Sequence, residues 1–401
     1  MDETSVVERM SVGIVLHDLS LGGTERIALR LARQWARSGA KVTVFCGSSK
    51  GELQQLLCPS IELVEAPTPI ERGLRSLQRL GQAAADHFHM HPVDVVFIPG
   101  NFHWRVVPAL ARLPRHVRPA IVTQVSAALD KRQRGPLRQA WFDLRMRLRL
   151  RGVDGAICMS ERAREQANHI LRRNVAIRIP LPALDEDTPP PVAVQPDCRI
   201  VVAAGRLVRE KGFSTLIEAF ACVGDPDARL MIIGKGPDEA RLRRQIFELG
   251  MMGRISLPGF APCIRPWLDQ CRAFVLSSHY EGFPAVVVEA LAAGRQVIAT
   301  RCTHAVKDLA IEGRIGRSVP ICDAGAMAEA IREILASAPP DPEVLAAAVA
   351  MHRIGGIAED YLQAFRRCIR QTGAGVSSAP YAAGPRPVPA ARTAYALRRS
   401  A

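Results

Sequence analysis

The amino-acid sequence predicts an α/β protein with two doubly wound domains that face each other across a cleft. Three observations support this prediction. The chain has 401 residues, which is long for a single hydrophobic core. Short apolar runs alternate with helical patterns through both halves. A stretch dense in proline and acidic residues, over 183–197, separates the two halves and is typical of a linker.

The first half opens with a strand, a glycine-containing loop, a helix and a second strand. Apolar runs at 12–16 and 42–45 predict the two strands, and Ile27, Leu31 and Trp35 recur at helical spacing between them. This order is typical of a parallel sheet. Further strands are predicted at 93–100, 118–124 and 153–160, and a helix at 136–150.

A second series of such units follows the linker. Strands are predicted within 198–207, 228–237, 254–260, 271–278 and 296–300, and helices within 214–223, 238–250 and 284–294. The predicted domains are 1–182 and 198–350, followed by a helical segment at 351–371 that packs back on the first domain. Sheets of this kind bind ligands at the carboxyl ends of their strands, which here would line the cleft.

The composition restricts the classes of ligand and partner that the protein could bind. The net charge of +14 calls for a partner with negative charge, such as nucleic acid, anionic lipid or a phosphorylated small molecule. The segment 372–401 is rich in proline, alanine, glycine and serine and is predicted to be disordered. The ten cysteines are scattered and form no metal-binding or redox motif, which is typical of a cytosolic protein. Neither a signal peptide nor a membrane-spanning segment is predicted.

The stretch "SSHYEGFPAVVVEALAAG" carries two glutamates eight residues apart in a largely apolar segment. Glu281 is predicted in the loop after a strand, at the mouth of the cleft. Glu289 is predicted in the following helix, among valines and alanines. A buried carboxylate needs hydrogen-bond donors, which sugar or ribose hydroxyls could supply. The alternative is that Glu289 is solvated or serves as a cap.

The stretch "AAGRLVREKGF" places Arg206 and Lys211 around a strand-to-helix turn. Two cations beside backbone amides at a helix N-terminus can clamp a phosphate, although a solvated surface pair is the alternative. Glycine also lets main chain approach a ligand in the turns "LGGTE" and "IIGKGP". The glycines of these three turns are Gly22, Gly23, Gly205, Gly212, Gly234 and Gly236.

In these stretches the sequence resembles the retaining family-four glycosyltransferases with the GT-B fold. The resemblance rests on "LGGTERIALRLA", "GRLVREKGFSTLIEAF", "LMIIGKGP", "ISLPGF" and "SSHYEGFPAVVVEALAAGRQVIAT", and it extends over roughly residues 11–370. It implies two Rossmann-like domains, a UDP- or GDP-linked sugar as donor substrate, retention of anomeric configuration, and no metal or cofactor.

The resemblance also implies residue roles. Arg206 and Lys211 would bind the donor diphosphate and stabilise the departing phosphate, as a divalent cation does elsewhere. Glu281 would contact the transferred sugar and Glu289 the ribose, and Gly23 would let the N-terminal loop approach the diphosphate or the acceptor. The expected catalytic residues are Arg206, Lys211 and Glu281. The expected donor-binding residues are Gly22, Gly23, Gly205, Gly234, Gly236, Phe260, Gly282, Phe283, Pro284 and Glu289.

One departure from the family concerns the acceptor side. Many members carry a histidine just after the strand that matches "AIVT", where this chain has Gln124 and Ser126. Gln124 can hydrogen-bond a sugar but cannot titrate. His103 and His17 follow other predicted strands and are further acceptor candidates. For each histidine a packing or solvated role is the alternative.

The predicted helix at 136–150 is basic and amphipathic. Leu137, Trp141, Leu144 and Leu148 fall at helical spacing, and the arginines Arg138, Arg145 and Arg149 lie on other faces. Such a helix can lie on anionic lipid, or it can pack on its own domain with solvated arginines. The first alternative would make this cytoplasmic protein peripheral to the inner face of the cytoplasmic membrane.

The expected function is transfer of a sugar to a glycan or lipid-linked acceptor in bacterial exopolysaccharide or cell-envelope polysaccharide biosynthesis. A sugar-nucleotide epimerase on the same fold is one alternative. A non-catalytic nucleic-acid-binding protein is another, although paired glutamates in the cleft would repel a phosphate backbone. A dinucleotide-dependent oxidoreductase is disfavoured because no GxGxxG follows the first strand.

Overall fold

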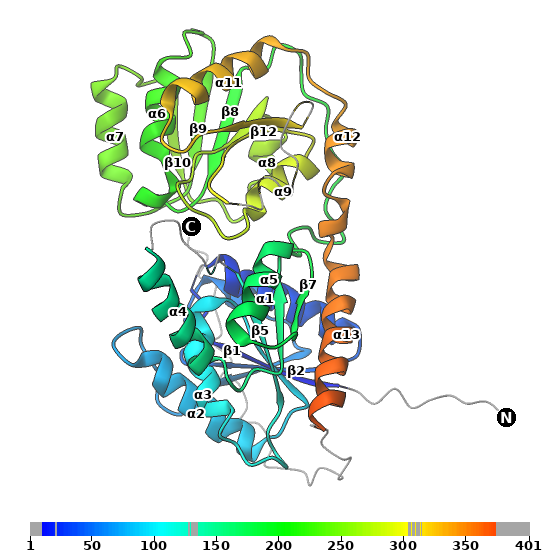
Figure 1. The fold of residues 1–401 in the computed structure, drawn as a ribbon. Helices are drawn as coiled ribbons and strands as arrows, with labels where there is room; N and C mark the ends of the chain where they lie inside the picture. Colours follow the sequence, from blue (N-terminus) through cyan, green and yellow to red (C-terminus); the bar gives the residue numbers. More distant parts are fainter. Residues whose placement is uncertain are drawn as a thin grey trace, which may run out of the picture.

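The computed structural model describes residues 10–373, except Leu21 and residues 127–128, 130–134, 304–305, 307–308, 310–312 and 314. Two parallel sheets, one in each half of the chain, form the framework of these residues (Figure 1). The α/β prediction is therefore confirmed. The tail predicted at 372–401 lies outside the described residues, apart from its first two positions.

The first sheet has seven parallel strands in the order β3-β2-β1-β4-β5-β6-β7. The order reverses between β1 and β4, which are neighbours in the sheet although far apart in the sequence. The strands are β1 (Ser11–Leu16), β2 (Lys41–Cys46), β3 (Ile61–Glu65), β4 (Val95–Ile98), β5 (Ala120–Val125), β6 (Gly155–Cys158) and β7 (Ala176–Arg178). The central strands are buried along nearly their whole length because helices cover both faces of the sheet.

Helices connect these strands and pack on the sheet. The apolar side of α1 buries Ile27, Leu31 and Trp35, as its helical spacing predicted. The elements are α1 (Gly23–Arg37), η1 (Glu52–Leu56), α2 (Ser76–Met90), η2 (Asn101–Val106), α3 (Val107–Leu110), α4 (Pro136–Arg149) and α5 (Glu161–Leu171).

The second sheet has six parallel strands in the order β10-β9-β8-β11-β12-β13. Its order reverses between β8 and β11. The strands are β8 (Ile200–Ala204), β9 (Arg229–Ile233), β10 (Ile255–Gly259), β11 (Ala273–Leu276), β12 (Gln296–Thr300) and β13 (Gly316–Val319). The helical elements are η3 (Arg209–Lys211), α6 (Phe213–Ala221), α7 (Glu239–Glu248), α8 (Arg265–Leu268), α9 (Ala285–Ala292), α11 (Ala324–Ala336), α12 (Pro342–Ala347), η4 (Ala350–His352) and α13 (Ile354–Thr372).

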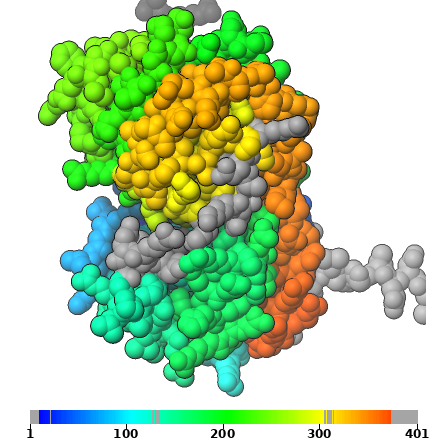
Figure 2. Space-filling model, turned by 45° about the horizontal axis from the view of Figure 1, so that its top comes forward, coloured from blue at the N-terminus to red at the C-terminus, as the bar shows by residue number. Residues whose placement is uncertain are grey.

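The last helix returns to the first domain, as predicted. The segment from α12 to α13 runs along the side of both lobes, where Figure 2 shows it in orange. The indole nitrogen of Trp35 donates a 3.0 Å hydrogen bond to the carbonyl of Ala358. The rings of Tyr361 and Phe365 pack against the same tryptophan. The chain therefore crosses between the two lobes twice, once through the linker and once through this segment.

Candidate functional site

The loop after β11 holds Glu281 beside Lys211, which follows β8. The Lys211 Nζ atom lies 2.5 Å from Glu281 Oε1, and the Ser278 hydroxyl donates a 2.8 Å hydrogen bond to the same carboxylate oxygen. Both charged side chains are mostly shielded from solvent. Because β8 and β11 are the strands between which the sheet order reverses, the pair lies at the position where doubly wound sheets bind ligands.

The turn that carries Lys211 is fixed to the loop after β11 by backbone contacts. The Ser277 hydroxyl donates to the carbonyl of Lys211 at 2.8 Å, and the His279 amide donates to the carbonyl of Glu210, also at 2.8 Å. Gly212 has a φ of +64°, and a Cβ there would lie 2.1 Å from the carbonyl oxygen of Ser277. Only glycine suits this close approach, so Gly212 helps to position Lys211.

Arg206 lies on the surface of the same region. Its side chain is 69% exposed, and its guanidinium lies 3.3 Å from the similarly exposed carboxylate of Glu210. An ion pair of this kind is weak and leaves the guanidinium able to turn toward an anion. The structure therefore brings Lys211 and Glu281 together, whereas Arg206 lies near them in the chain without a direct contact to either among the hydrogen bonds of the described residues.

The glycines of the other turns in the second half have a packing role of their own. Gly234 has a φ of +152°, and a Cβ there would lie 1.8 Å from the Gly205 carbonyl oxygen. A Cβ on Gly236 would lie 2.3 Å from the Leu207 carbonyl oxygen. The loops after β8 and β9 thus pack backbone against backbone. This contact explains the glycines without a ligand, so their donor-binding role stays a prediction.

Glu289 lies in the wall of a cavity of about 180 Å³ between the two halves of the molecule. Arg26 and Arg30 of α1 contribute from the first half, and Asp185 contributes from the linker. Burial raises the pKa of Glu289, and the charges of Arg26 and Arg30 oppose that rise. The carboxylate is thus held in an interior position with open volume in front of it, as a hydroxyl-binding role requires.

The remaining predicted donor residues have different surroundings. Phe260 follows β10 and is 45% exposed, so its ring is available to an incoming ligand. The Gly282 carbonyl accepts a 2.9 Å hydrogen bond from the Thr303 hydroxyl. The ring of Phe283 packs 5.3 Å from that of His352. Pro284 caps α9. Gly282, Phe283 and Pro284 therefore shape the loop that holds Glu281.

At the start of α1 the two predicted glycines differ. Gly22 is the N-cap residue, and a Cβ on it would lie 2.1 Å from a carboxylate oxygen of Glu25. Among the described residues, nothing lies within 4 Å of a Cβ position on Gly23. Main chain at Gly23 is thus open to a ligand, as its predicted role requires.

The carboxyl ends of β1 and β4 carry a charged and aromatic cluster. Asp18 accepts hydrogen bonds of 2.5 and 2.9 Å from the guanidinium of Arg72, and His17 Nδ1 lies 3.0 Å from the same carboxylate. Burial alone would raise the pKa of Asp18, but hydrogen bonds from Arg72 and Ser20 outweigh burial and hold that pKa well below its usual range. The Arg72 guanidinium also lies over the partly exposed ring of Phe102.

Two of the predicted acceptor residues point into the core instead. His103 is fully buried: its Nδ1 lies 2.8 Å from the Pro99 carbonyl, and its Nε2 accepts the His17 amide at 3.1 Å. Burial lowers the pKa of His103 to about 4. Gln124 is also buried and donates a 2.8 Å hydrogen bond to the Tyr361 hydroxyl. Both side chains are occupied by internal hydrogen bonds, so the packing alternative describes His103, and Gln124 fastens α13.

His17 remains the acceptor candidate on this side. It is fully buried, and its Nε2 has no hydrogen-bond partner among the described residues. Sequence patterns did not predict Arg72, Phe102 or Ser278, nor the contributions of Arg26 and Arg30 to the cavity. The positions of Phe102 and Ser278, just after β4 and β11, are the signal that could have found them. Among the described residues, no group of three or more histidine, cysteine, aspartate or glutamate side chains is placed to hold a metal ion.

Two parallel sheets, with charged groups at the carboxyl ends where each order reverses, define the class of two-domain α/β enzymes with the GT-B fold. The family model described as "Glycosyl transferases group 1" matches residues 185–348, and the one described as "Glycosyltransferase Family 4" matches residues 21–179. The chain belongs to the family-four glycosyltransferases.

Individual relatives match over limited segments. The lipopolysaccharide core biosynthesis glycosyltransferase LpsE of Rhizobium meliloti is 36% identical over 35% of this chain and 40% of its own length. The N-acetylgalactosamine-N,N'-diacetylbacillosaminyl-diphospho-undecaprenol 4-alpha-N-acetylgalactosaminyltransferase of Campylobacter jejuni is 27% identical over 34% of this chain and 37% of its own length. The matches thus span well under half of these relatives.

Among solved structures, Anabaena HepE in complex with UDP superposes with a TM-score of 0.69. It shares 16% identity, and the superposition covers 89% of this chain and 100% of that chain. At this identity the likeness establishes the fold.

Proposed function

We propose that this protein is a retaining glycosyltransferase that moves a sugar from a UDP- or GDP-linked donor to a glycan or lipid-linked acceptor. The observation that carries the proposal is the placement of Lys211 beside Glu281 where the order of the second sheet reverses. A cation and a carboxylate held side by side suit a ligand that offers both a diphosphate and sugar hydroxyls. Family membership and the solved complex of HepE with UDP support the same donor class.

In the proposed complex, Lys211 and Arg206 bind the diphosphate. Arg206 exchanges its weak contact with Glu210 for a phosphate oxygen. Glu289 accepts hydrogen bonds from the ribose hydroxyls within its cavity, and Phe260 lies against the base. Glu281 accepts a hydrogen bond from a hydroxyl of the transferred sugar while it keeps Lys211 oriented.

The chemical step breaks the bond between the anomeric carbon and the diphosphate oxygen and forms a bond to the acceptor oxygen on the same face. The acceptor proton passes to the departing phosphate, so no dedicated base is needed. Lys211 and Arg206 stabilise the negative charge that grows on the leaving diphosphate. In this proposal no metal ion takes part, because the two cations supply that stabilisation.

The acceptor belongs on the side of the first sheet. The cluster of Asp18, Arg72 and Phe102 offers a charge and an aromatic face there. His17 adds an Nε2 atom that has no hydrogen-bond partner among the described residues. The names of the relatives support a role in bacterial cell-envelope polysaccharide synthesis, and one relative is named for an undecaprenol-linked substrate. Both names fit a cytoplasmic enzyme that binds its acceptor at the membrane surface.

The proposal is tested by calorimetric titration of the full chain with UDP, GDP and a panel of nucleotide sugars, with and without EDTA. We expect one nucleotide to bind well and EDTA to have no effect. Binding of DNA in place of any nucleotide would reject the proposal. A donor converted to an epimer when no acceptor is present would show the epimerase instead.

A further inference from the structure

Helix α4 carries an apolar surface that faces solvent. Leu137, Trp141, Leu144 and Leu148 are 86, 62, 51 and 65% exposed. They recur at intervals of four, three and four residues and so form one stripe along the helix. The residue that α4 buries in the domain core is Met146, which lies on the opposite side of the helix. The stripe therefore faces solvent, although the helix itself packs on its own domain through Met146, as the second alternative from the sequence describes.

A row of arginines borders this stripe. Arg138, Arg145 and Arg149 share one side of the helix next to it, because they too are spaced by multiples of about 3.6 residues. The Arg145 guanidinium lies 4.8 Å from the centre of the Trp141 ring. Asp143, the acidic residue of α4, accepts a hydrogen bond from Gln139 and lies on the other side of the helix.

Within the part of the chain that the structure describes, the charges that act on Arg149 come from other arginines. Burial lowers the pKa of Arg149, and the charges of Arg105 in η2 and Arg145 lower it further. Three guanidinium groups from two elements therefore gather beside the apolar stripe. A docked surface that supplied negative charge would relieve their mutual repulsion and would bury the stripe at the same time.

We propose that α4 is the surface by which this protein docks on an anionic lipid bilayer, with the stripe in the acyl boundary and the arginines on lipid phosphates. The proposal rests on the proposed function, because it supplies the membrane contact that a lipid-linked acceptor requires. The adjoining arginine row favours lipid over a second copy of this chain, since two such helices would repel each other.

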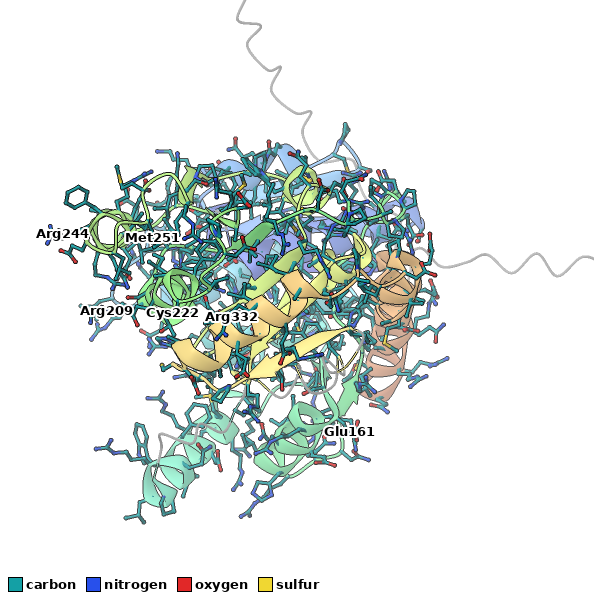
Figure 3. All side chains as sticks on the ribbon, turned by 90° about the horizontal axis from the view of Figure 1, so that it is seen from above. Glu161, Arg209, Cys222, Arg244, Met251 and Arg332 are labelled. Carbon is teal, nitrogen blue, oxygen red and sulfur yellow. The ribbon has the colours of Figure 1, made fainter. Side chains whose placement is uncertain are left out.

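The position of α4 suits this role. The helix projects at the edge of the first domain, on the side opposite α13 (Figure 1), and Figure 3 shows it standing away from the main body next to α5, where Glu161 is labelled. It is the next helix after β5, whose carboxyl end lies on the same edge of the sheet as the His17 and Arg72 cluster. Docking through α4 would thus hold the acceptor side of the enzyme at the bilayer. Within the described residues, no helix is both long and apolar enough to span a bilayer.

Vesicle sedimentation of the full chain tests the proposal. We expect binding to vesicles that contain phosphatidylglycerol, weaker binding as salt rises, and little binding to pure phosphatidylcholine. Replacement of Arg138, Arg145 and Arg149 by glutamine should weaken binding roughly 100-fold, since each charge near such a surface contributes about 1 kcal/mol. The matched control replaces three exposed arginines elsewhere, Arg244, Arg332 and Arg370, by glutamine and should stay within about threefold of the wild type.

Fluorescence tests the apolar part separately. Trp35 and Trp104 are buried and Trp267 is partly buried, whereas Trp141 is 62% exposed. Vesicles should therefore shift the emission to the blue, and Trp141→Phe should abolish the shift without preventing sedimentation. Equal binding by the arginine variant and the wild type, or a shift that survives Trp141→Phe, would overturn the proposal. So would self-association that is lost when the four stripe residues become serine.

Nucleotide titration of the same variants separates this proposal from the proposed function. The arginine variant should bind UDP or GDP as the wild type does. A wild type that docks on vesicles but binds no nucleotide would reject the proposed function and leave the docking surface intact.

Discussion

Lys211 is the residue whose loss should affect the reaction most. Lys211→Ala should lower turnover on the order of 100-fold or more, because its charge is needed most as the phosphate departs. The fold should survive, since the lysine side chain is partly exposed and Ser278 still donates to Glu281. Steady-state kinetics with a soluble acceptor measure the effect, and thermal unfolding checks the fold. Turnover within about threefold of the wild type would show that Lys211 does not act on the leaving group.

Glu289→Gln should lower nucleotide affinity without lowering the stability of the fold. Burial raises the pKa of Glu289, so above the usual carboxyl pKa its ionised form costs stability in the folded protein. The neutral isostere removes that cost, and we expect unchanged or higher resistance to urea at pH 8. Nucleotide affinity should fall about tenfold, because a charged acceptor makes a stronger hydrogen bond to ribose than an amide does. Lower stability with unchanged affinity would contradict both expectations.

His103 should make stability depend on pH. Its pKa in the folded protein is about 4, whereas an unfolded histidine titrates near about 6.5. Below that pH the unfolded chain binds a proton that the folded chain does not, so stability falls as the pH drops from about 6.5 to about 4. The loss should reach about 3 kcal/mol, at about 1.4 kcal/mol per pH unit.

Urea unfolding across this pH range measures the effect of His103, and His103→Gln is the matched control. Glutamine can donate to the Pro99 carbonyl and accept from the His17 amide, the two hydrogen bonds that the imidazole makes, but it does not titrate. An equally steep pH dependence in the glutamine variant would assign the proton to another group.

Sequence patterns located the functional residues better than they identified their partners. Glu281 and Lys211 were predictable because parallel strands place the residues after them on one edge of a sheet. His103 and Gln124 also follow or end strands, but their side chains turn into the core, where Pro99 and Tyr361 bind them. Tyr361 is 237 residues from Gln124, and no local pattern reveals a contact over that separation.

At the scale of one element, the turn from η3 to α6 should be sensitive to any side chain at Gly212. Gly212→Ala would force a left-handed backbone on alanine and would drive its Cβ against the Ser277 carbonyl oxygen, 2.1 Å away. We expect a loss of about 2–3 kcal/mol of stability and a fall in turnover, because Lys211 precedes the turn directly.

Gly224→Ala is the control for this prediction. Gly224 also has a positive φ, +78°, but nothing lies within 4 Å of its Cβ position. The substitution should cost only the backbone strain, about 1 kcal/mol, and should leave turnover unchanged. Thermal unfolding and kinetics of the two variants compare them directly. Equal effects would show that the close contact with Ser277 does not matter.

The elements that were predicted from the sequence share a strong signal. The strands β1, β8, β11 and β12 are apolar runs, because helices cover both faces of their sheets. Two of the elements that were not predicted, the strand β3 and the helix α2, carry a weaker signal. The strand β3 lies at a sheet edge and alternates Ile61 and Leu63 with acids. The helix α2 buries Gly81, Ala84 and Ala85, whose small side chains give a weak periodic signal.

At the scale of the whole molecule, α13 fastens the end of the chain to the first domain. Leu184, at the start of the linker, pairs in a parallel bridge with Arg353, which directly precedes α13. From there Tyr361 and Phe365 pack against both Trp35 and Phe97. Residues from opposite ends of the chain thus form one aromatic cluster, and the first domain is complete only when the last helix is in place.

The buried hydrogen bond between Gln124 and Tyr361 tests this dependence. Tyr361→Phe should cost about 1–3 kcal/mol, because it leaves the buried Gln124 amide without its 2.8 Å partner. Gln124→Leu should lower stability by a similar amount, because it leaves the buried Tyr361 hydroxyl without this hydrogen-bond partner. The double variant should lose about 1 kcal/mol less stability than the two single variants lose together. Two apolar groups can face each other there without leaving an unpaired donor. Urea unfolding of the four proteins completes the cycle.

Nucleotide affinity should be equal in all four proteins, because the pair lies in the first domain and the nucleotide residues lie mainly in the second. Additive losses would show that α13 is held by its aromatic packing alone.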